Sequence, residues 1–119
     1  VVEKQNPINV WGDGEDLKDF LYIDDFIDGL SRIVFDFNEF DIINLASGKG
    51  ITIKEILNLI IELESAESLK IEFDKSKPTM IPKRLINISK AKKLLNFNPK
   101  IEMKEGLYNT IKWYRENKV

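Results

Sequence analysis

The sequence predicts an α/β protein in which short strands alternate with amphipathic helices. Two observations lead to this class: several stretches repeat apolar residues at helical spacing, and others are short, β-branched and bounded by glycine or proline. The chain has 119 residues, of which 43% are apolar, so it can form one modest core. We therefore expect residues 1–119 to form a single domain.

The N-terminal part predicts two strands separated by a tight turn. Ile8–Trp11 is short and apolar, and it ends at Gly12-Asp13-Gly14, a turn of residues that tolerate positive φ. Phe20–Ile23 is a second apolar run that is too short to be a helix. We expect this run to be a strand as well.

A helix is predicted from Asp25 to about Asn38. Asp24 and Asp25 stand where it begins, and we expect their carboxylates to cap the N–H groups of its first turn. The apolar stripe that defines the helix consists of Phe26, Ile27, Leu30, Ile33, Val34 and Phe37.

A second strand and helix pair is predicted around a glycine loop. Asp41–Leu45 is apolar and β-branched, so we expect a buried strand that ends in the loop 46–50. Thr52 and Glu55 have the spacing of a capping box, which predicts a helix from about Ile53 to Glu64.

The C-terminal part predicts a strand, a loop and two helices. Lys70–Phe73 alternates like a strand, and Pro78–Pro82 must be extended because proline restricts the residue before it. Ser89 is placed to cap a short helix that ends at Leu95. The closing helix is expected over residues 104–116.

Composition limits the chemistry that this chain can perform. It has no cysteine and no histidine, so thiolate nucleophiles, cysteine zinc sites and the commonest general base are absent. No apolar run reaches the roughly 18 residues of a membrane span, and the first residues lack the build of a signal peptide. We expect a cytoplasmic protein without a metal site. Val1 and Val2 look like interior residues, which suggests a fragment.

The loop Ser47–Thr52 contains Gly48 and Gly50 and invites comparison with a dinucleotide-binding turn. The third glycine of that fingerprint is missing, and no acid follows in the right context at the end of a next strand about 20 residues later. A turn followed by a helix cap therefore explains these glycines better.

The clearest candidates for ligand binding are basic residues around a proline-rich loop. Charge is uneven along the chain, with ten acids among residues 13–41 and nine basic residues among residues 74–104. Lys77 precedes the loop Pro78–Pro82, Lys83 and Arg84 follow it, and Lys18 lies after the glycine turn. Three cations on a rigid loop suit a phosphate-bearing ligand, and solvated surface lysines are the alternative.

Three segments, taken in order, resemble one enzyme family. They are VWGDGEDLKDFLYIDDFIDGL, INLASGKGITIKEI, and the C-terminal stretch that starts at DKSKPTMIPKR and contains SKAKKLLNFNP. Together they resemble the extended short-chain dehydrogenases/reductases, that is, the NAD-dependent sugar-nucleotide epimerases and dehydratases and the reductases similar to GDP-L-fucose synthase. The resemblance implies the C-terminal, substrate-binding part of a Rossmann-like enzyme.

The resemblance also implies a substrate site. Lys18 takes the position of an arginine that contacts the nucleotide diphosphate in the family, and Lys77 and Arg84 lie in the loop that closes on the same phosphates. Trp11 lies on the strand that, in relatives, approaches the nucleotide base. For Trp11, packing in the core is the alternative that we favour.

The family's catalytic groups are not expected in this chain. Relatives bind NAD or NADP through an N-terminal glycine fingerprint and use a Tyr-x-x-x-Lys pair. Tyr108 with Lys112 and Tyr114 with Lys118 match that spacing, but they lie on the closing helix, where the family has no active site. We expect no catalytic residue and no bound cofactor in this chain alone. The expected partners are a nucleotide-diphosphate sugar, a missing N-terminal Rossmann half and, in the full-length enzyme, a second subunit.

Two other interpretations remain open from the sequence. One is a stand-alone module that binds an anion or a nucleic acid through the basic C-terminal segment, although the acidic first half and the lack of interleaved aromatics argue against nucleic acid. The other is a regulatory relative that kept the fold and lost the chemistry.

Overall fold

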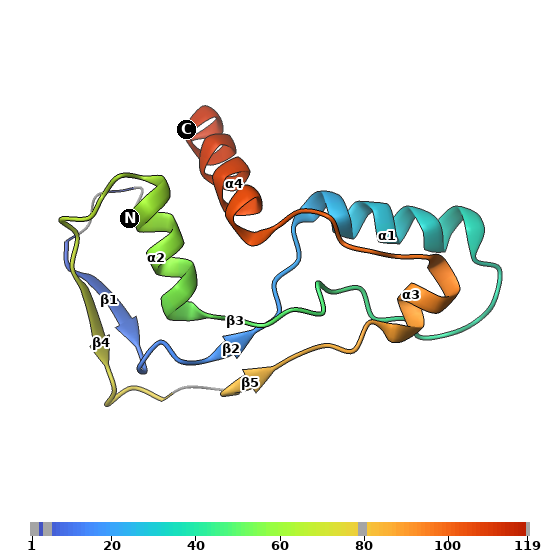
Figure 1. The fold of residues 1–119 in the computed structure, drawn as a ribbon, viewed down its shortest axis with the longest axis horizontal. Coiled ribbons are helices and arrows are strands. Elements are labelled where there is room, and N and C mark those ends of the chain that lie inside the picture. The colour runs from blue at the N-terminus through green and yellow to red at the C-terminus, as the bar shows by residue number, and fades with distance from the viewer. Residues whose placement is uncertain (1–2, 4–5, 79–80, 119) are drawn as a thin grey trace.

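A computed structural model describes residue 3 and residues 6–78 and 81–118 of the chain. Helices and strands alternate, as the sequence predicts (Figure 1). In chain order they are β1 (Ile8–Trp11), β2 (Leu17–Lys18), α1 (Ile23–Asp36), β3 (Ile51–Thr52), α2 (Ile53–Leu63), β4 (Ile71–Asp74), β5 (Lys83–Arg84), α3 (Ser89–Leu95) and α4 (Met103–Asn117).

The strands form two small sheets. In the first, β1 runs parallel to β4, with Ile8 opposite Ile71 and Trp11 opposite Asp74. In the second, β2 lies in the middle, antiparallel to β3 and parallel to β5. Figure 1 shows the second sheet between the β1–β4 pair at one end and α1 with α3 at the other. Segments far apart in the sequence therefore meet in the centre of the molecule.

The best-packed region lies beneath α1. Ala91 and Leu95 of α3 and the following Phe97 are buried together. Around them pack the partly buried side chains of Leu21, Ile33, Phe37, Ile43 and Leu45. This cluster fixes α1 against α3 and leaves the other end of the molecule, with α2 and α4, more loosely packed: α2 buries none of its residues.

Several sequence predictions are confirmed. Gly12 and Gly14 have φ of 85° and 79°, as the turn requires. The side chains of Thr52 and Glu55 form both hydrogen bonds of the capping box at the start of α2. The closing helix and the strand near residue 71 are present within one residue of their expected bounds. In the predicted loop Pro78–Pro82, Thr79 and Met80 lie outside the described residues.

The predicted strand at Phe20–Ile23 is wrong. The strand is instead Leu17–Lys18, which finds partners on both sides in β3 and β5. Ile23 is the first residue of α1. Backbone pairing decided the position of the strand, whereas the prediction followed the apolar side chains.

The predicted strand at Asp41–Leu45 is also absent. Ile43 and Leu45 turn toward the core cluster, while the Ile42 side chain is 83% exposed. Among the described residues no strand pairs with this segment. A strand needs a neighbour to complete its hydrogen bonds, so the sequence pattern alone did not suffice.

The predicted capping roles of Asp25 and Ser89 are wrong as well. The N-cap of α1 is Tyr22, which makes no side-chain capping bond. The buried Asp25 carboxylate accepts hydrogen bonds from the backbone N–H groups of Lys100 (3.0 Å) and Ile101 (2.9 Å). Ser89 is the first residue inside α3 rather than its cap.

Candidate functional site

The sheet places Lys18 beside Arg84. These residues are opposite each other in the parallel pair β2–β5, and the Leu17 N–H donates to the Pro82 carbonyl at 2.8 Å. Opposed residues of neighbouring strands project on the same face of a sheet. Two of the predicted phosphate-binding cations are far apart in the sequence, and the sheet therefore places them next to each other on adjacent strands.

Lys18 is held by two groups that sequence reasoning missed. Its ammonium forms an ion pair with Asp16 at 3.1 Å and donates a hydrogen bond to the Ile81 carbonyl. The side chain is only 22% exposed. An ammonium has three donors, so these two partners leave one donor for a ligand. Nothing in the spacing of Asp16 marked it, because acids are common throughout this stretch.

Trp11 and Lys77 both lie near Asp74, at the end of the β1–β4 pair, where Trp11 is opposite Asp74. The Asp74 carbonyl accepts hydrogen bonds from Gly12 N–H (2.9 Å) and from Lys77 N–H (3.2 Å). The preference for Trp11 as a core residue is wrong, because its side chain is 67% exposed. An exposed indole at a strand end is available for stacking.

A cavity of about 310 Å³ is lined by residues of the segment between β1 and β2 and by residues of the segment between β4 and β5. Its lining includes Asp16, the partner of Lys18, and Lys77. The other lining residues are Gly12, Asp13, Glu15, Lys75 and Pro82. Because three carboxylates and two ammonium groups line it, the cavity is not a purely cationic phosphate pocket. Of the four predicted site residues, Lys77 lines this cavity, whereas Lys18, Arg84 and Trp11 do not.

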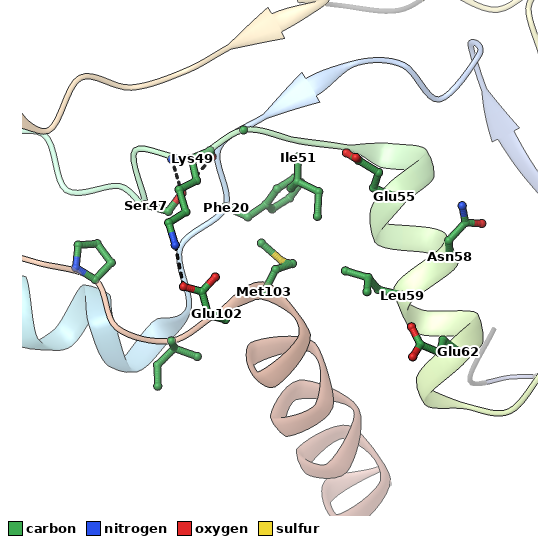
Figure 2. A pocket seen from close by; sticks show the side chains of 13 residues that line it. Phe20, Ser47, Lys49, Ile51, Glu55, Asn58, Leu59, Glu62, Glu102 and Met103 are labelled. Carbon is green, nitrogen blue, oxygen red and sulfur yellow. Dashed lines mark hydrogen bonds and ion pairs between the residues drawn. The ribbon is translucent and has the colours of Figure 1, made fainter.

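A larger cavity of about 540 Å³ lies between α2, α4 and the loop 47–50 (Figure 2). Figure 2 shows Phe20, Ile51, Leu59 and Met103 pointing toward one another, so its interior is apolar. An ion pair between Lys49 and Glu102, at 2.7 Å, closes one side. This cavity could not be predicted from the sequence, because its residues come from separate segments that only the tertiary structure joins.

The loop at Gly48 has its backbone donors already satisfied. The Asp19 carboxylate accepts from the Ser47 N–H (2.8 Å), the Ser47 hydroxyl (2.5 Å) and the Gly48 N–H (2.9 Å). Gly48 has φ of 72°, which suits a turn. A carboxylate thus lies where a bound pyrophosphate would need these donors, and the turn interpretation is confirmed.

Tyr114 has the wrong electrostatic environment for a catalytic base. Its hydroxyl donates to Glu3 at 2.5 Å, and this hydrogen bond, with burial and the Glu3 charge, raises the pKa of Tyr114. A tyrosine that accepts a proton near neutral pH needs a lowered pKa.

The described residues contain no group of three or more acidic, histidine or cysteine side chains that could hold a metal ion. In the same part of the chain, no helix is long and apolar enough to cross a membrane.

The fold and the order of these elements define a class. Residues 1–110 match the family model for GDP-mannose 4,6 dehydratase. The chain therefore belongs to this family of extended short-chain dehydrogenases/reductases, and its fold is that of their Rossmann-like structures.

Two relatives match more than 90% of this chain. The chain is 37% identical over 108 residues to a probable GDP-L-fucose synthase of Oryza sativa, covering 91% of this chain and 32% of that protein. It is 37% identical over 117 residues to a UDP-glucuronate 4-epimerase of Thermodesulfobacterium geofontis, covering 98% of this chain and 36% of that protein. The chain thus spans about a third of the length of these relatives.

Two solved structures of epimerases have a similar fold over most of this chain. An epimerase from Methanothermobacter thermautotrophicus has a TM-score of 0.87 at 28% identity, covering 98% of this chain and 35% of that one. UDP-glucuronic acid 4-epimerase from Bacillus cereus, solved with UDP-glucuronic acid and NAD, has a TM-score of 0.78 at 30% identity, covering 90% of this chain and 35% of that one.

Proposed function

We propose that this chain is the nucleotide-sugar-binding portion of an NAD(P)-dependent sugar-nucleotide epimerase, dehydratase or reductase, and that it is inactive alone. The observation that carries the proposal is the pairing of Lys18 with Arg84 across β2 and β5. Two cations opposite each other on neighbouring strands suit the two charges of a diphosphate.

In this proposal, each part of the ligand is bound by a different residue. Arg84, which is exposed on β5, offers a planar fork to one phosphate, and Lys18 offers its remaining donor to the other. Lys77 adds a third positive charge beside the cavity at the end of β4. The exposed indole of Trp11 would stack on the nucleotide base.

In this proposal the redox chemistry belongs to the rest of the enzyme. Bound NAD or NADP would accept or return a hydride at the sugar, and a Rossmann half outside this chain would hold it. This chain's part is to bind and orient the nucleotide end of the substrate, so that its sugar reaches the nicotinamide. We further propose that the full-length enzyme is a homodimer and that it works in the cytoplasm.

Expression of the chain with and without its upstream polypeptide tests the proposal. Turnover of UDP-, GDP- and dTDP-sugars with NAD or NADP should appear only in the longer form. In that form Lys18→Ala should weaken binding of the nucleotide sugar about 10-fold or more, as expected for a lost charged hydrogen bond. Lys92→Ala, which removes an exposed lysine of α3, is the matched control.

The proposal fails if the longer form neither binds nor converts any of the three nucleotide sugars. Binding of a nucleic acid oligonucleotide with a steep salt dependence would favour the stand-alone binding module instead.

A further inference from the structure

The ion pair between Asp16 and Lys18 is more sheltered from solvent than the other ion pairs of the molecule. The side chains of Lys18 and Asp16 are 22% and 18% exposed. In the part of the chain that the structure describes, each other ion pair has a lysine or arginine side chain that is at least 30% exposed. Charges that water surrounds less are screened less, so the Asp16 carboxylate acts more strongly on neighbouring charges than an exposed acid does.

Asp16 also limits how Lys18 can bind an anion. One donor of the Lys18 ammonium is directed at the Asp16 carboxylate and a second at the Ile81 carbonyl, so one donor is left. The carboxylate oxygen is 3.1 Å from the ammonium nitrogen, which is nearly as close as a bound phosphate oxygen would be. Any anion that binds Lys18 therefore lies near a fixed negative charge.

The proposed diphosphate site has a smaller positive charge than its basic residues suggest. Lys18 and Arg84, which are opposite each other on β2 and β5, contribute two positive charges, and Asp16 offsets one of them. Lys83 is opposite Leu17 instead. Because neighbouring residues of a strand project on opposite faces, Lys83 does not add its charge to the pair.

Two classes of nucleotide ligand differ in charge at such a site. In a nucleotide sugar, both phosphates are linked on two sides, so each carries a single negative charge. In a nucleoside diphosphate or triphosphate, the terminal phosphate is linked on one side only and carries up to about one further negative charge near neutral pH. The base and the ribose are the same in both classes, so contacts with those parts cannot distinguish them.

We propose that Asp16 is a specificity-determining residue, whose carboxylate shifts the preference of the site toward nucleotide sugars and away from free nucleoside diphosphates and triphosphates. The carboxylate repels the extra charge of a terminal phosphate, while Lys18 still donates one hydrogen bond to a singly charged phosphate. A repulsive group of this kind lowers the affinity for both ligands, but it lowers the affinity for the unwanted ligand more. The proposal rests on the proposed function, because the diphosphate must bind at Lys18 and Arg84.

Removal of the Asp16 charge tests this selectivity in the longer polypeptide. Asp16→Asn keeps an oxygen acceptor for the Lys18 ammonium and has nearly the same shape. Calorimetry would give the Kd values of UDP and UDP-glucose, or of GDP and GDP-mannose if the protein binds guanine nucleotides. In Asp16→Asn, the affinity for the nucleoside diphosphate should rise about 5-fold to 10-fold more than that for the nucleotide sugar, as expected for unit charges about 6 Å apart. An unchanged ratio of the two Kd values would overturn the proposal.

Glu15→Gln is the matched control. Glu15 is next to Asp16 in the sequence and lines the same cavity, but its carboxylate pairs with Lys54 at 3.5 Å and its side chain is 62% exposed. This variant removes the same charge, and it should change the ratio of the Kd values by less than about 2-fold, because water and salt screen an exposed carboxylate. Equal effects of the two variants would mean that the total charge of the segment sets the preference, and this would contradict the role of Asp16.

A second pair of ligands separates charge from contacts with the sugar. The β-methyl ester of UDP or GDP has both phosphates of the parent nucleoside diphosphate and the charge of a nucleotide sugar. Asp16→Asn should favour the parent over the ester by the same factor of about 5 to 10, relative to the native protein. A change seen only with the sugar ligand would mean that Asp16 acts on the sugar, and the proposal would be wrong.

Asp16→Ser removes the same charge with a smaller side chain and should shift the ratio in the same direction, so the test does not depend on one variant. If the longer polypeptide binds none of the nucleotide sugars, the proposed function fails and the role of Asp16 fails with it. If it binds them and neither Asp16 variant changes the ratio, only the role of Asp16 fails.

Discussion

Helices α1 and α2 begin in opposite ways. At the start of α2, Thr52 and Glu55 exchange hydrogen bonds, with Glu55 N–H to the Thr52 hydroxyl at 3.1 Å and Thr52 N–H to the Glu55 carboxylate at 2.8 Å. At the start of α1 there is no side-chain cap, and Asp25 binds the segment 100–101 instead. Helix α2 is thus defined by its own sequence, whereas α1 is positioned by residues far along the chain.

This difference predicts that the position of α1 in the fold depends most on the hydrogen bonds of Asp25. Replacing the buried Asp25 by alanine leaves the partly buried N–H groups of Lys100 and Ile101 without their acceptor. We expect Asp25→Ala to lower the free energy of unfolding by about 2–3 kcal/mol, since unpaired buried donors are costly. Denaturant unfolding measures this loss.

The neighbouring acid supplies the control for that experiment. Asp24 is exposed on the same turn, so Asp24→Ala should change stability by less than about 0.5 kcal/mol. Equal effects of the two variants would mean that the first turn, and not the bond to residues 100–101, needs the acid.

The packing of α1 on the core predicts the next largest effect. In Gly29→Ala the new methyl group would meet Leu45 and Phe97 at 2.9 Å. We expect a loss of about 1–2 kcal/mol in spite of alanine's better helix propensity. On α2, the exposed Asn58→Ala should be neutral or slightly stabilising. Thermal unfolding of both variants checks the comparison, and a stabilised Gly29→Ala would show that the core can move aside.

At the start of α2, the capping box should be the main local contribution to the stability of the helix. Thr52→Ala removes one half of the capping box and should cost about 1 kcal/mol. Circular dichroism and urea unfolding would detect it. Thr52→Ser keeps the hydroxyl and should retain most of the stability, so a Ser variant as weak as the Ala variant would contradict the capping role.

The smallest predicted effect is on acid stability. Hydrogen bonds from the Thr52 N–H and hydroxyl lower the pKa of Glu55 below its ordinary value of 4.5. A carboxyl with a lowered pKa contributes stability above its ordinary pKa and loses it as pH falls through the lowered pKa. The unfolding midpoint of the native chain should therefore fall more steeply below pH 4.5 than that of Glu55→Gln. Parallel curves would exclude a contribution from this carboxylate.

Acid should affect α1 through a different pair. The hydrogen bond from Arg32 lowers the pKa of Asp28 below its ordinary value of 3.8. As for Glu55, a lowered pKa means that the Asp28 carboxylate contributes to stability above pH 3.8. This small contribution is lost only as pH falls below that value. Because this ion pair is exposed, salt should weaken it.

The candidate site was only partly visible in the sequence. The basic residues and the glycine turn could be named because charge and positive φ leave local signals. The partners of Lys18 could not, since Asp16 looks like any other acid and the Ile81 group is a backbone carbonyl. The exposure of Trp11 was also mispredicted, because burial is set by what packs against a side chain.

The sequence by itself determined the α/β class, the turn at Gly12–Gly14 and helix α2 with its cap, because these depend on residues within a few positions of one another. Only the tertiary structure decided that Leu17–Lys18 is the central strand and that Asp25 binds the segment 100–101. It also decided that residues 41–45 are not a strand within this chain. Strand pairing and buried hydrogen bonds need partners distant in sequence, and no local pattern specifies where those partners lie.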